Sequence, residues 1–110
     1  MRKFGRITGR RRLFKQVLAH NLIMKGGMTT TVARAKEMRP IVEHYVSISK
    51  KGGIASFRRL LAKLPKASAE KLFYELAPKY KTRTGGYLRI IKSAKRRKRD
   101  AAEVARIEFV

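Results

Sequence analysis

The chain has 110 residues, with 29 Lys or Arg against seven Asp or Glu, and carries a formal net charge of +22. A hydrophobic content of 44% excludes wholesale disorder, the absence of cysteine excludes disulfides and thiolate metal sites, and no apolar run reaches the length of a membrane span. From the lack of cysteine and of a membrane span we expect a soluble, intracellular protein. Because a compact body with this charge repels itself, we further expect it to be stabilised by a polyanion, above all nucleic acid.

The first fifteen residues hold seven cations and no acid. Residues 1–9 have too little apolar content to pack, which predicts an extended basic arm that is disordered when free. From Arg10 onward, apolar residues recur at helical spacing and predict an amphipathic helix that ends at Gly26-Gly27. The apolar face of this helix comprises Leu13, Phe14, Val17, Leu18 and Leu22. Cations in the first turn oppose the helix dipole, so they favour an external anionic partner.

A short strand and a long helix are predicted next. Residues 28–31, Met-Thr-Thr-Thr, suit a strand, and Thr31 can cap a helix over residues 32–50. Pro40 lies inside this helix and should kink it, although the apolar face keeps its phase across the proline.

Two shorter helices follow the glycine pair at 52–53. Apolar spacing predicts one over residues 54–64, stopped by Pro65, and another over residues 66–76, stopped by Pro78. The second of them mixes acids with cations and is the least basic segment of the chain.

The C-terminal third predicts a hairpin. Residues 79–99 hold ten cations and no acid, and Gly85-Gly86 form a turn before a strand over residues 87–92. We expect the run of cations at 95–99 to be a loop, since like charges so close together resist regular packing. Residues 104–110 alternate apolar and charged side chains and predict a closing antiparallel strand.

These elements predict an α+β fold in a single domain over residues 1–110, with about four helices packed on a small, about three-stranded sheet, mixed or antiparallel. Residues 1–9 would form the basic arm and residues 10–110 the body. Residues 1–15 and 79–99 together hold seventeen of the 29 cations. We expect the fold to bring these two cationic poles to one side that faces RNA.

The candidate RNA contacts are mostly cations in these two poles and at the start of the long helix. They are Arg2, Lys3, Arg6, Arg10, Arg11, Arg12, Lys15, Arg34, Lys36, Arg39, Lys81, Arg83, Gly85, Gly86, Tyr87, Arg89, Lys92, Lys95, Arg96 and Arg97. For each there is a simpler interpretation, namely a solubilising tail, the solvent face of a helix, or a hydrated loop. Gly85-Gly86 either let backbone amides approach a phosphate or form a plain turn. Tyr87 either stacks on an unpaired base or packs on the neighbouring strand.

Nothing in the sequence indicates catalysis or a cofactor. His20 and His44 have no Cys or second His at ligand spacing, so a metal site is not expected. Neither a phosphate-binding glycine motif nor a nucleophile with its base is present. We therefore expect neither a cofactor nor a small-molecule substrate.

Four stretches resemble the family of bacterial large-subunit ribosomal protein seventeen, in family order over almost the whole chain. The first resembles the family signature Thr-Thr-x-x-Arg-Ala-Lys-Glu-Leu-Arg, with Met38 at its Leu position. The stretches read TTVARAKEMRP at 30–40, KLFYELAPKY at 71–80, RTGGYLRIIK at 83–92 and ARIEFV at 105–110. The resemblance implies an α+β domain that binds and stabilises large-subunit ribosomal RNA near the nascent-chain exit and supports translation. It further implies neighbouring ribosomal proteins as partners and a place in the cytoplasmic ribosome.

A DNA-compacting or DNA-regulating basic protein is the alternative. Such a protein is expected to present a recognition helix with base-reading amides, or a dimer surface. Gln16 and Asn21 are the only amide side chains in the chain, which favours the ribosomal interpretation.

Overall fold

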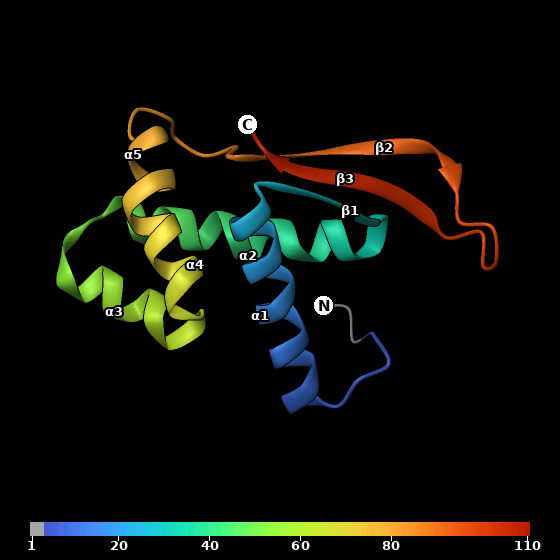
Figure 1. Ribbon diagram of the computed structural model, residues 1–110, viewed down its shortest axis with the longest axis horizontal. Coiled ribbons are helices and arrows are strands. Elements are labelled where there is room, and N and C mark those ends of the chain that lie inside the picture. Colours follow the sequence, from blue (N-terminus) through green and yellow to red (C-terminus); the bar gives the residue numbers. More distant parts are fainter. Residues whose placement is uncertain (1–3) are drawn as a thin grey trace.

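The longest helix, α2 (Val32–Lys50), lies along one face of a small sheet in the computed structural model, which describes residues 4–110 (Figure 1). It begins where the sequence predicts, because the Thr31 side chain accepts a hydrogen bond from the backbone N–H of Arg34 at 3.3 Å. The helix continues through Pro40 as one element. Val42 and Val46 on its inner face are fully buried, so α2 supplies the centre of the core.

The sheet has three antiparallel strands, β1 (Gly27–Thr31), β2 (Leu88–Arg96) and β3 (Glu103–Phe109), in the order β1-β3-β2. Met28, Ile107 and Ile90 stand in one cross-strand row on the face that packs against the core. Successive side chains alternate between the two faces of a strand, so the next row, with Thr29 and Arg106, lies on the open face. The predicted α+β class and the antiparallel pairing of the last two strands are confirmed.

Helix α1 (Thr8–Lys25) begins two residues before the predicted start and ends at Gly26, whose φ of 78° is left-handed. Its C-terminal half is buried, with Leu22 and Ile23 fully covered. The N-terminal half projects away from the rest of the molecule (Figure 1). Leu13 and Val17 are therefore 62% and 56% exposed, and their assignment to the buried face was wrong.

Helix α3 (Gly53–Lys63) precedes one continuous helical stretch made of α4 (Lys66–Lys71), a π-helical segment η1 (Leu72–Leu76) and α5 (Ala77–Lys79). The predicted stop at Pro78 was wrong, because the helix passes through this residue to Lys79. A proline ring normally clashes with the carbonyl four residues earlier and leaves it without a donor. The π turn η1 ends at Leu76, two residues before Pro78, and its wider winding changes the spacing of those carbonyls.

The hairpin of β2 and β3 extends beyond the body of the molecule (Figure 1). Lys95 and Arg96, predicted to lie in a loop, belong to β2 instead. Two acids on the returning side explain the difference. Arg96 forms an ion pair with Glu103 at 3.1 Å, and Arg97 pairs with Asp100. These pairs neutralise charge that would otherwise oppose strand pairing.

Candidate nucleic-acid interface

Within residues 4–110, six of the seven acids form ion pairs, and most of the cations have no acidic partner. Glu37 pairs with Lys15, Glu43 with Arg39, and Glu70 with Lys66. Glu108 pairs with Arg89 and Arg106, Glu103 with Arg96, and Asp100 with Arg97. Since the chain has 29 cations, a large positive excess faces outward even after every pair is counted. That excess is available to the phosphates of a nucleic acid.

One cationic group, which we call the arm cluster, consists of Arg6, Arg34 and Arg97. The Arg6 guanidinium lies 3.8 Å from the centroid of the Phe14 ring, and that of Arg34 lies 5.0 Å from the same centroid. Arg34 and Arg97 line a common hollow of about 360 Å³ beside the end of β1. The cluster therefore joins the arm, the start of α2 and the hairpin, which are far apart in sequence.

Phe4 also packs on Phe14, with ring centroids 5.3 Å apart. The prediction that residues 1–9 have too little apolar content to pack is therefore wrong for Phe4. Arg2 and Lys3 lie outside the described residues. Arg11 donates a hydrogen bond to the backbone carbonyl of Arg6 at 3.4 Å, so it supports the arm from α1.

Arg97 in this cluster is held by a carboxylate. Its guanidinium donates two hydrogen bonds to Asp100, which raise the pKa of Arg97. The same hydrogen bonds are the main reason that the pKa of Asp100 lies below its ordinary value, with a second contribution from the backbone N–H of Ala102. The pair is thus fully ionised at neutral pH, and it orders the tip of the hairpin.

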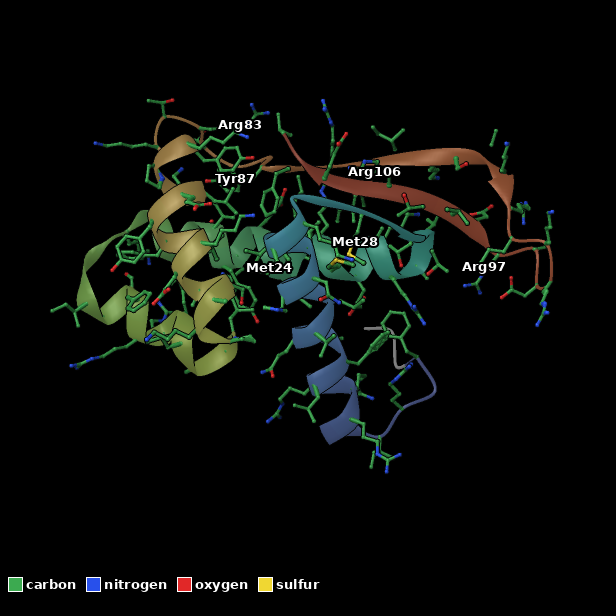
Figure 2. The ribbon with its side chains drawn as sticks, in the orientation of Figure 1. Met24, Met28, Arg83, Tyr87, Arg97 and Arg106 are labelled. Atoms are coloured by element: carbon green, nitrogen blue, oxygen red, sulfur yellow. The ribbon has the colours of Figure 1, made fainter. Side chains whose placement is uncertain are left out.

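A second group, the loop cluster, consists of Lys50, Lys81 and Arg83 at the C-terminal end of α2. Lys50 donates hydrogen bonds to the Tyr87 hydroxyl at 2.8 Å and to the backbone carbonyl of Arg83. Tyr87 donates to the same carbonyl at 3.2 Å, and the Arg83 guanidinium donates to the carbonyl of Gly86, also at 3.2 Å. Figure 2 shows Arg83 and Tyr87 beside each other between α5 and β2. These bonds fix the loop that carries Lys81 and Arg83.

Tyr87 is a structural residue in this loop. Its side chain is only 4% exposed and its ring lies 5.3 Å from that of Tyr80, so stacking on a base is contradicted and packing is observed. The hydrogen bond from Lys50 lowers the pKa of Tyr87 and outweighs burial, which acts in the opposite direction. Gly85 and Gly86 have φ values of 94° and 63°, a left-handed backbone that favours glycine. That requirement of the turn is enough to explain both glycines.

The predicted second pole is divided between the two clusters. Arg97 lies with Arg34 at the start of α2, whereas Lys81 lies with Lys50 at its end. Arg34 and Lys50 are sixteen positions apart in the helix, which corresponds to about 24 Å at ~1.5 Å per residue. The arm cluster and the loop cluster thus lie at opposite ends of α2 rather than on one continuous face.

Besides Arg89, Arg96 and Arg97, two further candidate residues form internal ion pairs. Lys15 lies 3.0 Å from Glu37, and both side chains are largely covered. Arg39 pairs with Glu43 one helical turn away. By contrast, Arg10, Arg12 and Lys36 are exposed.

The open face of the sheet carries a third group of charges. Arg89 and Arg106 both hydrogen-bond the Glu108 carboxylate, at 3.0 and 3.4 Å, and Arg89 is the main reason that the pKa of Glu108 is lowered. Figure 2 shows Arg106 on the sheet. Beyond this trio, Lys92, Lys95 and Arg96 are exposed along β2.

Sequence reasoning missed Lys50 and Arg106. Side chains alternate between the two faces of the closing strand, so Arg106 lies on the face away from the buried Ile107. This alternation could have identified Arg106 as a surface cation. Nothing local to Lys50 indicates its bond to Tyr87, which is 37 residues away.

Within residues 4–110, no three or more His, Cys, Asp or Glu side chains are grouped so that they could hold a metal ion. None of the helices in this part of the chain is both long enough and apolar enough to cross a membrane. The interface described above consists of exposed and half-buried cations carried by helices, strands and loops.

Known proteins share this sequence over nearly its full length. The profile of the family described as Ribosomal protein L17 matches residues 13–110. The chain is 43% identical to the large ribosomal subunit protein bL17 of Hydrogenobaculum sp., in a match that covers 97% of this chain and 92% of that protein. The proteins of the same name from Sphingopyxis alaskensis and Clostridioides difficile are 46% and 44% identical. Each match covers 99% of this chain, and 78% and 96% of the relative, respectively. The resemblance carried by the four motifs is thereby confirmed, and the chain belongs to the ribosomal protein L17 family.

Proposed function

We propose that this protein is a structural constituent of the large ribosomal subunit in the cytoplasm. It binds and stabilises large-subunit ribosomal RNA near the nascent-chain exit, beside neighbouring ribosomal proteins, and has no catalytic role. Its relatives are named as proteins of the large ribosomal subunit, which supports a place in that subunit. The observation that carries the RNA-binding role is the uncompensated positive charge, because six of the seven acids are already paired within the protein.

In this function the arm cluster and the loop cluster contact phosphates at two separated places on the RNA. Each phosphate neutralised releases condensed counterions, which supplies affinity. Because the clusters are fixed at opposite ends of α2, only an RNA whose folded shape presents phosphates at that separation satisfies both. Specificity then comes from RNA shape rather than from base reading.

Filter binding over a range of salt concentrations tests this function. We expect the protein to prefer a cognate fragment of large-subunit ribosomal RNA over duplex DNA of equal length, with affinity for both falling steeply as salt rises. Equal affinity for the RNA and the DNA, together with an obligate dimer in gel filtration at high salt, would support the DNA-compacting alternative instead. Loss of the protein from large subunits after a high-salt wash would argue against stable incorporation.

A further inference from the structure

An aromatic patch lies exposed where α3 meets the π-helical segment. Phe57, Phe73 and Tyr74 form a three-ring group, with centroids 5.1 to 5.9 Å apart. Together with Ile54 they line an open hollow of about 310 Å³. Ile54 is 72% exposed and Tyr74 is 65% exposed. Large apolar side chains gathered at the surface in this way mark a contact site.

The local backbone sets the Tyr74 ring at the edge of the hollow. Leu72 is fully buried, and the π turn of η1 starts at this residue. Phe73 and Tyr74 are adjacent in sequence and lie edge to face, at 83°. π-Helical turns frequently occur at functional sites, and here the turn carries a tyrosine that is largely exposed.

A second hollow, of about 330 Å³, shares Phe73 with the first. Its lining includes Ser49, Pro78 and two lysines of the loop cluster, Lys50 and Lys81. Lys50 is held in place by the Tyr87 hydroxyl, whereas Lys81 is exposed. In the described part of the chain, neither hollow is lined by an acid. An apolar aromatic surface and a positive surface therefore meet at Phe73.

We propose that the two hollows together bind one unpaired nucleotide of RNA, with its base stacked on Tyr74 and a flanking phosphate beside Lys81. A nucleotide is the ligand that joins a planar apolar face to a negative charge, which is the pairing of surfaces that meets at Phe73. An apolar protein segment would use the aromatic hollow and leave the lysines without a counterpart. The proposal rests on the RNA-binding function above and adds to it a site for a base outside the helices.

The test uses the full-length protein and a single-stranded RNA that contains 2-aminopurine, whose fluorescence is quenched on stacking. We expect quenching with the single strand and none when the same base is paired in a duplex. Tyr74→Ala should weaken binding of the single strand about 10-fold, in line with the range for loss of a base–aromatic stack, and should abolish the quenching. Tyr74→Phe, which keeps the ring, should retain both.

Two controls separate this site from general RNA binding. Leu13→Ala removes a comparably exposed apolar side chain on the projecting half of α1 and should leave the quenching unchanged. Lys81→Gln should lower the slope of log affinity against log salt concentration by about one, the loss expected for one phosphate contact. The 2-aminopurine of the duplex should stay unquenched with this variant. Thermal unfolding of Tyr74→Ala confirms that the variant is folded.

If wild-type protein binds ribosomal RNA but Tyr74→Ala behaves like Leu13→Ala, the nucleotide site is overturned and the proposed function stands. If the strand never quenches, and Tyr74 is protected from chemical modification only within assembled subunits by another protein, the hollow is a protein contact and the proposal also fails. Absence of any preference for ribosomal RNA would instead overturn the function on which the proposal rests.

Discussion

The Nζ atom of Lys50, in the last turn of α2, lies 2.8 Å from the hydroxyl oxygen of Tyr87, directly before β2. Both groups also donate to the carbonyl of Arg83, so three residues close the loop that carries the glycine pair. These hydrogen bonds link α2, at the centre of the core, to the loop before β2. The sequence alone indicates only a charged turn in this loop.

Tyr87→Phe should destabilise the protein by about 1 kcal/mol, because the ring still packs but a buried hydrogen-bonding group is lost. The midpoint of urea unfolding measures this effect. Lys50→Met should cost a similar amount, whereas Lys51→Met, at the exposed next position, should be nearly neutral. Equal midpoints for all three variants and the wild type would show that the link does not contribute to stability.

The Glu108 carboxylate predicts a pH dependence. Its pKa in the folded protein lies below the ordinary value of 4.5, chiefly because Arg89 donates a hydrogen bond to it. A carboxyl with a depressed folded pKa contributes stability that is fully present above its unfolded pKa and is lost as pH falls through the folded value. The melting temperature of the wild type should therefore exceed that of Glu108→Gln at pH 6.

This difference should shrink as the pH is lowered below about 4.5, the ordinary pKa of the group. Glu75→Gln on η1 serves as the control, since that side chain is exposed and distant in sequence from the sheet. A constant difference between wild type and Glu108→Gln from pH 3 to pH 6 would contradict the assignment.

Thr31 caps α2, so Thr31→Ala should cost about 1 kcal/mol in the free energy of unfolding. Thr31→Ser retains the hydroxyl and should recover most of that loss. Thr29→Ala changes the same residue type in the same strand, at an exposed position, and provides the matched comparison. Chemical denaturation of the three variants ranks them, and an equal loss for Thr29 and Thr31 would mean that strand propensity, rather than capping, is measured.

Phe14 contacts the guanidinium groups of Arg6 and Arg34. Phe14→Leu should therefore lower the affinity for RNA by a larger free energy than it lowers the stability of the fold. Leucine keeps an apolar side chain at this half-buried position but removes the ring under Arg6 and Arg34. Cation–π contacts of about 0.5–1 kcal/mol each correspond to a loss of affinity of about 5-fold or more when both contribute to holding the guanidinium groups. Titration of the ribosomal RNA fragment measures the affinity, with Leu61→Ala on α3, an exposed apolar position outside the arm cluster and both hollows, as the comparison. An unchanged affinity would indicate that the arm cluster is not ordered through Phe14.

Much of the fold follows from short-range patterns in the sequence. Thr31 marks the start of α2 by its hydroxyl, and the alternation of Ala105, Ile107 and Phe109 identifies the buried face of β3. Such signals act within a few residues, where the backbone hydrogen bonds and the side-chain period are themselves decided.

Features that depend on distant neighbours were not predictable in this way. Leu13 and Val17 have helical spacing like that of Leu18 and Leu22, yet only the latter pair meets the rest of the protein. The helix passes through Pro78 after a π turn that no residue type specifies. The grouping of Arg34 with Arg97, and the burial of Tyr87, likewise depend on packing between segments.

The exposed cations along β2 have one more consequence. In the order β1-β3-β2, β2 is an edge strand whose outer backbone groups remain open to another strand. Edge strands invite pairing between copies of a protein, and charged side chains discourage it. Lys92, Lys95 and Arg96 would bring like charges together if two copies met along this edge. The same charge that we propose attracts RNA would thus also oppose pairing of two copies of the protein along this edge.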